Sequence, residues 1–153
     1  MKTIATFLLL FLSTQAFAQL NVSCKYREMC LWDEDEESFN DCKGYEENSR
    51  FKINEDETMF IHTTETIQSA YYINEKEVDD ETGVIIYYVE SDVGNEYVYF
   101  FDLEHDEIRI AAEMEGEMVM VRFMVKKVWS NKERSRKKFD LRNHSSVEKD
   151  RRM

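Results

Sequence analysis

Three cysteines, Cys24, Cys30 and Cys42, flank an unbroken run of five acidic residues, Asp33 to Glu37. Thiolates and carboxylates both bind metal ions, so this stretch is the first place to look for a chemical site. Structural zinc sites use four ligands at short spacings such as Cys-x2-Cys, whereas here five and eleven residues separate the cysteines and no histidine is near. A calcium-binding EF-hand loop needs a glycine at its sharp turn and a closing glutamate, and this stretch has neither. We therefore expect no metal and no cofactor.

The first 18 residues predict export, which bears on the state of the cysteines. Lys2 supplies a positive charge, residues 4–12 form a short apolar run, and Ala16-Phe17-Ala18 offers small residues to signal peptidase. The apolar run is too short for a bilayer span of ~20 residues. We expect cleavage after Ala18 and a secreted or periplasmic chain.

Cysteines of exported proteins tend to form disulfides. If residues 33–38 form the turn of a hairpin, its centre lies near residue 36, and Cys30 and Cys42 are equidistant from it. Directly opposed residues of an antiparallel pair approach closely enough for a bridge. This spacing predicts a Cys30–Cys42 disulfide with Cys24 free. Cys24–Cys42 is the alternative, because strands need not pair symmetrically.

Motifs of catalytic sites are missing from the sequence. It contains no Gly-x-Ser-x-Gly, no His-Glu-x-x-His and no glycine-rich phosphate loop. The histidines His62, His105 and His144 are scattered, and we expect each of them on the surface. We predict no catalytic residue, although a pair of carboxylates among the many acids stays open as an alternative.

Six tyrosines on three successive apolar runs are the candidates for ligand binding. Tyrosine combines an apolar ring with a polar tip, so those outside the core could line a ligand pocket or a partner surface. Packing across neighbouring strands is the alternative. The six are Tyr71, Tyr72, Tyr87, Tyr88, Tyr97 and Tyr99. A methionine stripe (Met118, Met120 and Met124) is expected to fill the core.

The candidate residues lie in stretches of sequence whose pattern is typical of β-strands. Stretches rich in Val, Ile, Tyr and Phe recur about every ten residues, with Gly83, Gly94 and Gly116 in the turns between them. The expected strands are 22–32, 49–54, 58–63, 66–74, 83–91, 96–104, 107–114 and 117–129. The sequence therefore predicts an all-β protein, an antiparallel up-and-down meander of about eight strands within residues 19–129. Closing the sheet removes its edges, so we expect a small barrel or a strongly curved sheet.

Charge divides the chain into an acidic body and a basic tail. Residues 19–125 hold 8 Lys or Arg and 28 Asp or Glu, whereas residues 126–153 hold 11 basic and 4 acidic residues. The acidic body repels nucleic acid, which requires a basic face. Residues 130–153 show no sustained hydrophobic period, so we expect a poorly ordered tail that either contacts anionic surfaces or folds back on the body.

Three functional hypotheses follow. The first is an exported, non-enzymatic binding module that holds a small ligand or a protein on a tyrosine-rich sheet face or at a barrel mouth. The second is an envelope or protein-interaction factor that acts through its basic tail. The third is a hydrolase that depends on two carboxylates. The sequence leaves the identity of the ligand and the oligomeric state open.

Overall fold

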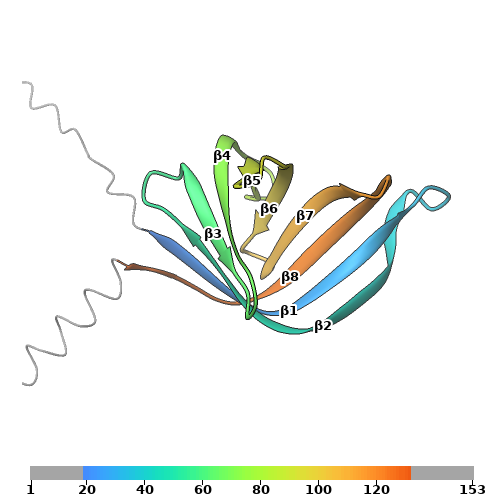
Figure 1. Ribbon diagram of the computed structural model, residues 1–153, viewed down its shortest axis with the longest axis horizontal. Coiled ribbons are helices and arrows are strands. Elements are labelled where there is room, and N and C mark those ends of the chain that lie inside the picture. Colours follow the sequence, from blue (N-terminus) through green and yellow to red (C-terminus); the bar gives the residue numbers. More distant parts are fainter. Residues whose placement is uncertain (1–18, 132–153) are drawn as a thin grey trace, which may run out of the picture.

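The computed structural model describes residues 19–131, which form a closed barrel of eight antiparallel strands (Figure 1). Each strand pairs with the next along the chain, and β8 pairs with β1 to close the barrel. The strands are β1 (Leu20–Asp33), β2 (Ser38–Ile53), β3 (Met59–Thr63), β4 (Gln68–Val78), β5 (Ile85–Ser91), β6 (Glu96–Asp102), β7 (Glu107–Met114) and β8 (Glu117–Ser130). The predicted all-β meander of about eight strands is confirmed, and it closes rather than staying an open sheet.

The expected leader (1–18) and most of the expected tail (from residue 132) lie outside the described residues. Among the described residues, no helix is long and apolar enough to span a membrane.

Aromatic rings fill the interior of the barrel. On β6, buried and less buried side chains alternate, and Tyr99 and Phe101 point inward with 1% of their surface exposed. Phe51 of β2 lies at the centre of the cluster, with its ring centroid 5.3 Å from that of Phe123 and 5.7 Å from that of Phe101. Edge-to-face packing of this kind suits the charge distribution of aromatic rings. The core is therefore packed with side chains.

The expectation that the methionine stripe fills the core is wrong. On β8 the inward positions belong to Val121, Phe123 and Val125, all buried. Successive side chains of a strand point to opposite faces, so the three methionines lie on the outside, and Met118 is 45% exposed.

The turn end of the β1–β2 hairpin projects beyond the barrel. It lies on the side opposite to the start of β1 and the end of β8, which pair with each other (Figure 1). β2 pairs with β3 only from Arg50 to Ile53, so residues 38–49 have β1 as their one neighbouring strand. The predicted strand 49–54 is thus the end of a strand that begins eleven residues earlier, at Ser38.

The predicted disulfide joins Cys30 to Cys42 across this hairpin, with a Cα–Cα distance of 4.0 Å. Cys24 is free, as expected, and it is buried. The turn beyond the disulfide is fixed by Asp33, whose Oδ1 accepts hydrogen bonds from the backbone N–H of Asp35 (2.9 Å) and Glu36 (3.1 Å). The end of the hairpin is therefore a rigid, clasped element.

Candidate functional site

The six candidate tyrosines do not share one face. Tyr71, Tyr87, Tyr97 and Tyr99 belong to the core or pack against it, whereas Tyr72 and Tyr88 lie on the outside. Tyr87 and Tyr99 are each 1% exposed, and burial raises the pKa of both phenols. These two tyrosines fill the barrel and offer almost no surface to a ligand.

Two of the tyrosines, Tyr88 and Tyr97, line a hollow of about 390 Å³ on the side of the barrel formed by β5, β6 and β7. Met118 and the carboxylates Glu96 and Glu113 border the same hollow. Of the six candidate tyrosines, Tyr88 and Tyr97 are therefore the two that line this hollow, beside two carboxylates.

His62 is buried, so its expected place on the surface is wrong. It follows Phe60 by two residues on β3, and both side chains point into the barrel. The imidazole stacks on Phe51 at 4.1 Å and meets Phe123 edge-on at 5.0 Å. Burial, and secondarily the nearby charge of Arg27, lowers the pKa of His62 to about 4. His62 is thus a neutral core residue at physiological pH.

Cys24 and His62 lack the properties of a nucleophile and its base. Burial raises the pKa of the Cys24 thiol to about 12, and the thiolate is the reactive form of cysteine. Glu28 lies close to Cys30 and Cys42, with one ligand atom of each within 4.8 Å of the others. Both sulfur atoms are bonded to each other, so this group provides no thiolate for a metal ion.

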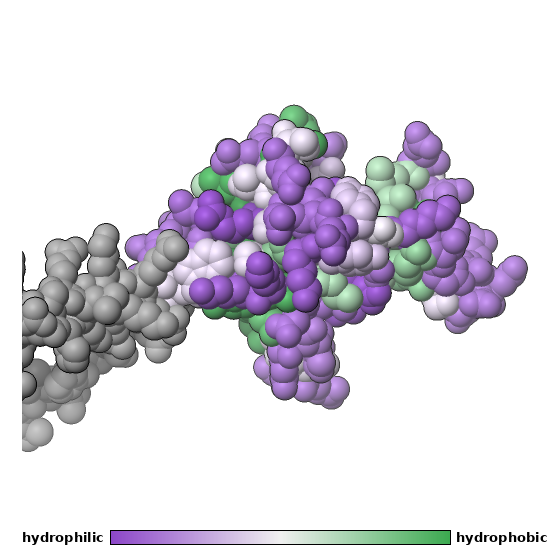
Figure 2. All heavy atoms as spheres, turned by 90° about the horizontal axis from the view of Figure 1, so that it is seen from below, coloured by the Kyte–Doolittle hydropathy of each residue, from purple (hydrophilic) through white to green (hydrophobic). Residues whose placement is uncertain are grey.

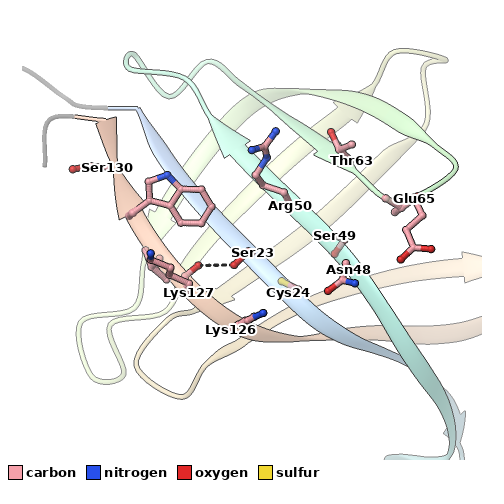
Figure 3. A pocket seen from close by; sticks show the side chains of 13 residues that line it. Ser23, Cys24, Asn48, Ser49, Arg50, Thr63, Glu65, Lys126, Lys127 and Ser130 are labelled. Atoms are coloured by element: carbon pink, nitrogen blue, oxygen red, sulfur yellow. Dashed lines mark hydrogen bonds between the residues drawn. The ribbon is translucent and has the colours of Figure 1, made fainter. Parts of the chain in front are cut away.

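An open groove of about 920 Å³ crosses β8, β1, β2 and the end of β3 (Figure 3). We call it the basic groove; its lining is residues 23–24, 48–50, 63–65 and 126–130. Arg50 of β2 and Lys127 of β8 lie on either side of β1, and Lys126 is next to Lys127 (Figure 3). Glu65 is the one acidic residue of the lining.

The β-strand register explains why these cations meet. Ser23 of β1 pairs with Arg50 on one side and with Lys127 on the other, so the two cations share the outer face. Thr63 of β3 pairs with Arg50 and continues the row. On β2 the outward Arg50 alternates with the buried Phe51, which is the ordinary alternation of a half-buried strand.

Trp129 adds an apolar wall to the groove. It is half-buried on β8, and the Lys127 Nζ atom lies 5.9 Å from the centroid of its indole ring. The hydroxyl of Ser23 donates a hydrogen bond to the Lys127 carbonyl at 3.4 Å, which ties β1 to β8 beneath the groove. Cations, hydroxyl groups and a flat aromatic side chain thus line one open surface.

The cations of this face differ from the others in having no carboxylate partner within the described part of the chain. Residues 19–131 contain ten Lys or Arg. Three of them line the groove, Arg50, Lys126 and Lys127. Two more are near them in the sequence: Lys25 follows the lining residue Cys24, and Lys52 is two residues from Arg50 on β2. None of these five forms an ion pair with a described residue, whereas four of the other five do, through Arg27–Glu47, Lys76–Glu57, Arg109–Glu107 and Arg122–Glu28. The exception is Lys43.

The unpaired cations of the groove lie in a part of the chain that is strongly acidic. The described residues carry ten basic and 28 acidic side chains, a net charge of −18. Hydrophilic side chains cover most of the face shown in Figure 2. Charges farther away than a Debye length of ~8 Å at physiological ionic strength are largely screened, and the lining itself holds three cations and one carboxylate.

Sequence reasoning missed the basic groove. Its residues come from four separate segments, and only the closure of β8 onto β1 brings Lys127 close to Arg50. The available indication was the outward position of Arg50 and Lys52 in the 49–54 run, where they alternate with Phe51 and Ile53.

Comparison of the chain with protein-family models, with curated proteins and with solved structures finds no match.

Proposed function

We propose that this protein is an exported, non-enzymatic binding module that holds an anionic partner in the basic groove. The observation that carries the proposal is the set of three cations without carboxylate partners that line one open groove, Arg50, Lys126 and Lys127, among described residues whose net charge is −18. The Cys30–Cys42 disulfide is compatible with an oxidising compartment and supports export.

The groove can supply both charge and shape. Lys and Arg head groups bind carboxylate, sulfate or phosphate through charge-assisted hydrogen bonds. Trp129 offers a flat apolar face to a ring or an aliphatic stretch of the partner. Because the groove is open and crosses several strands, it suits an extended anionic segment better than a small enclosed ligand.

Binding of a fluorescently labelled heparin fragment, followed by anisotropy at several salt concentrations, tests the proposal. Arg50→Gln should weaken binding about 3–5-fold, as expected for an exposed ionic contact of up to ~1 kcal/mol. Lys126→Gln/Lys127→Gln should weaken it about tenfold or more and flatten the salt dependence, because fewer counterions are released.

Lys43→Gln is the matched control, since Lys43 is also an exposed, unpaired cation of β2 and lies outside the groove. It should leave the affinity within about twofold. Equal losses for Lys43→Gln and Arg50→Gln would show that only net charge matters. Undiminished affinity of the Lys126→Gln/Lys127→Gln variant would place binding outside the groove, for example on the basic residues 132–153.

A second candidate is a small-ligand site at the hollow lined by Tyr88 and Tyr97. The two carboxylates Glu96 and Glu113 at its border favour a cationic or hydrogen-bond-donating ligand. Tyrosine fluorescence of the chain should respond to such a ligand, for which tetramethylammonium is a simple probe, and Tyr88→Ala should abolish the response. A response that Tyr88→Ala leaves unchanged would refute this site.

A further inference from the structure

The end of the β1–β2 hairpin is negatively charged, opposite in sign to the cations of the basic groove. Residues 30–42, here called the acidic tip, contain six Asp or Glu and no Lys or Arg. No carboxylate of the tip forms an ion pair with any described residue. Among the described residues, the cations of the groove and the carboxylates of the tip thus have no ionic partners.

The acidic tip is preformed. The Cys30–Cys42 disulfide clasps its two strands, and the Asn40 side-chain amide donates hydrogen bonds to Asp33 (3.1 Å) and Glu36 (3.0 Å). Trp32 packs edge-to-face on Phe39 at 5.0 Å while 40% of its surface is exposed. A rigid element loses little conformational entropy on binding, so the tip is suited to insertion.

The two elements cannot meet within one molecule. Ser23 at the groove and Asp33 at the tip are ten residues apart on the same strand, which at 3.3 Å per residue is about 33 Å. Figure 1 shows the hairpin projecting on the side opposite to the start of β1 and the end of β8. A contact between tip and groove therefore requires two molecules.

We propose that the acidic tip of one copy of this chain docks into the basic groove of a second copy. This inference rests on the proposed function, because it names the partner of the same groove. Asp and Glu side chains of the tip face Arg50, Lys126 and Lys127, and the exposed Trp32 meets the apolar wall at Trp129 and Val128.

The tip and the groove are different surfaces, so the contact between two copies is heterologous. In each pair of molecules, one tip and one groove remain free. Repetition builds an open chain or a ring. A single hairpin end buries a small area, at the low end of interface sizes. The assembly should therefore be reversible, weak and sensitive to salt.

Sedimentation velocity of the oxidised chain 19–153 tests the inference. At about 20 mM salt, where the Debye length is ~20 Å, the weight-average mass should rise with concentration. At about 500 mM salt, where the Debye length is ~4 Å, it should return to that of the monomer. A mass independent of concentration at low salt would overturn the inference.

Charge reversal identifies the surfaces. A groove variant (Lys126→Glu/Lys127→Glu) and a tip variant (Glu34→Lys/Asp35→Lys) should each be monomeric alone. An equimolar mixture should associate again, because the unmodified tip of the groove variant can dock into the unmodified groove of the tip variant, and the two reversed surfaces are also opposite in charge. The control Asp80→Lys/Glu81→Lys reverses two exposed acids of the β4–β5 turn and should associate like the unmodified chain.

Failure of the mixture to associate, or loss of association in the Asp80→Lys/Glu81→Lys control, would refute the docking. Heparin binding separates this inference from the proposed function. A chain that binds heparin through the groove but stays monomeric at low salt contradicts only the self-association. A groove variant that binds heparin as well as the unmodified chain contradicts both.

Discussion

His62 is a polar residue in an aromatic environment, between Phe51 and Phe123. Its Nε2 atom has no hydrogen-bond partner among the described residues. Stacking of the neutral ring replaces hydration, whereas a protonated imidazole would place a charge in the barrel beside Arg27. Stability should therefore depend on the protonation of this one residue.

The pKa of His62 is about 4 in the folded protein, below its ordinary value of 6.5. Between these values the unfolded chain binds a proton that the folded chain does not, so the free energy of unfolding falls as the pH falls. Between pH 7.5 and pH 4.5 this residue should remove about 2–3 kcal/mol. Urea denaturation at the two pH values measures the loss.

His62→Phe should show a smaller loss over the same interval, because phenylalanine does not titrate. The exposed His105, whose pKa is raised by Asp102, provides the control, and His105→Gln should retain the full loss. An equal loss in His62→Phe and the unmodified chain would contradict the account of His62.

Sequence alternation predicted some of these positions and failed at others for identifiable reasons. Cys30 and Cys42 could be paired from their mirror positions about the turn. For His62, the polar character of the residue was given more weight than its position two residues after Phe60. That position places both side chains on the same, inward face of the strand. For β8, Arg122 shares its face with the three methionines, and that charge, to which the prediction gave too little weight, already indicated that the methionines face outward.

At the scale of elements, the β1–β2 hairpin is the part that sequence patterns described least. Residues 38–48 are polar and contain Gly44, which argues against a strand, and yet they pair with β1 along most of their length. Pairing with a long neighbour and the disulfide outweigh the weak intrinsic preference. The local sequence of residues 38–48 does not predict this strand, because the strand forms by pairing with β1.

Gly44 is needed because of a close approach. A Cβ atom at this position would lie 2.6 Å from Cζ of Tyr26 and 2.8 Å from the Arg27 carbonyl oxygen. We expect Gly44→Ala to lower the free energy of unfolding by about 1–3 kcal/mol, as for other overpacked sites. The neighbouring Lys43→Ala should change it by less than about 0.5 kcal/mol. Equal midpoints of urea denaturation for the two variants would refute this packing.

The Cys30–Cys42 disulfide should stabilise the hairpin more than the barrel. Eleven residues lie between the two cysteines, and closing such a loop contributes ~2–3 kcal/mol. On reduction, hydrogen exchange at residues 38–42 should accelerate at least about tenfold, with a smaller change at Tyr87 to Val89 in the core. The same reductant should have no effect on Cys30→Ser/Cys42→Ser, and unchanged exchange in the unmodified chain would contradict the role of the disulfide.

At the scale of the whole molecule, paired and unpaired charges lie in different places. Four of the ten cations of the described part pair with carboxylates on the barrel, and five of the other six, all but Lys43, lie near the end where β1 begins and β8 ends. The chain continues from there into residues 132–153, which contain nine Lys or Arg and four Asp or Glu. The acidic tip lies at the other end of β1.

The sequence predicted the strand count, the meander and the acidic body, because each depends on local patterns or on composition. The basic groove depends on which strands become neighbours when the barrel closes, and on which cations find a carboxylate. Those properties arise from the register of β1 with β2 and β8, and no single segment encodes them. The hypothesis that the basic tail acts alone lies outside the described residues.

The central claim is that the groove receives the anionic partner. Its most direct test is a titration of ¹⁵N-labelled chain 19–153 with the heparin fragment, followed by NMR chemical shifts. We predict that the largest changes map to the backbone amides of residues 23–24, 48–50, 63–65 and 126–130, and that Tyr88 and Tyr97 stay unchanged. Changes confined to residues 132–153, or centred on the hollow of Tyr88 and Tyr97, would contradict the claim.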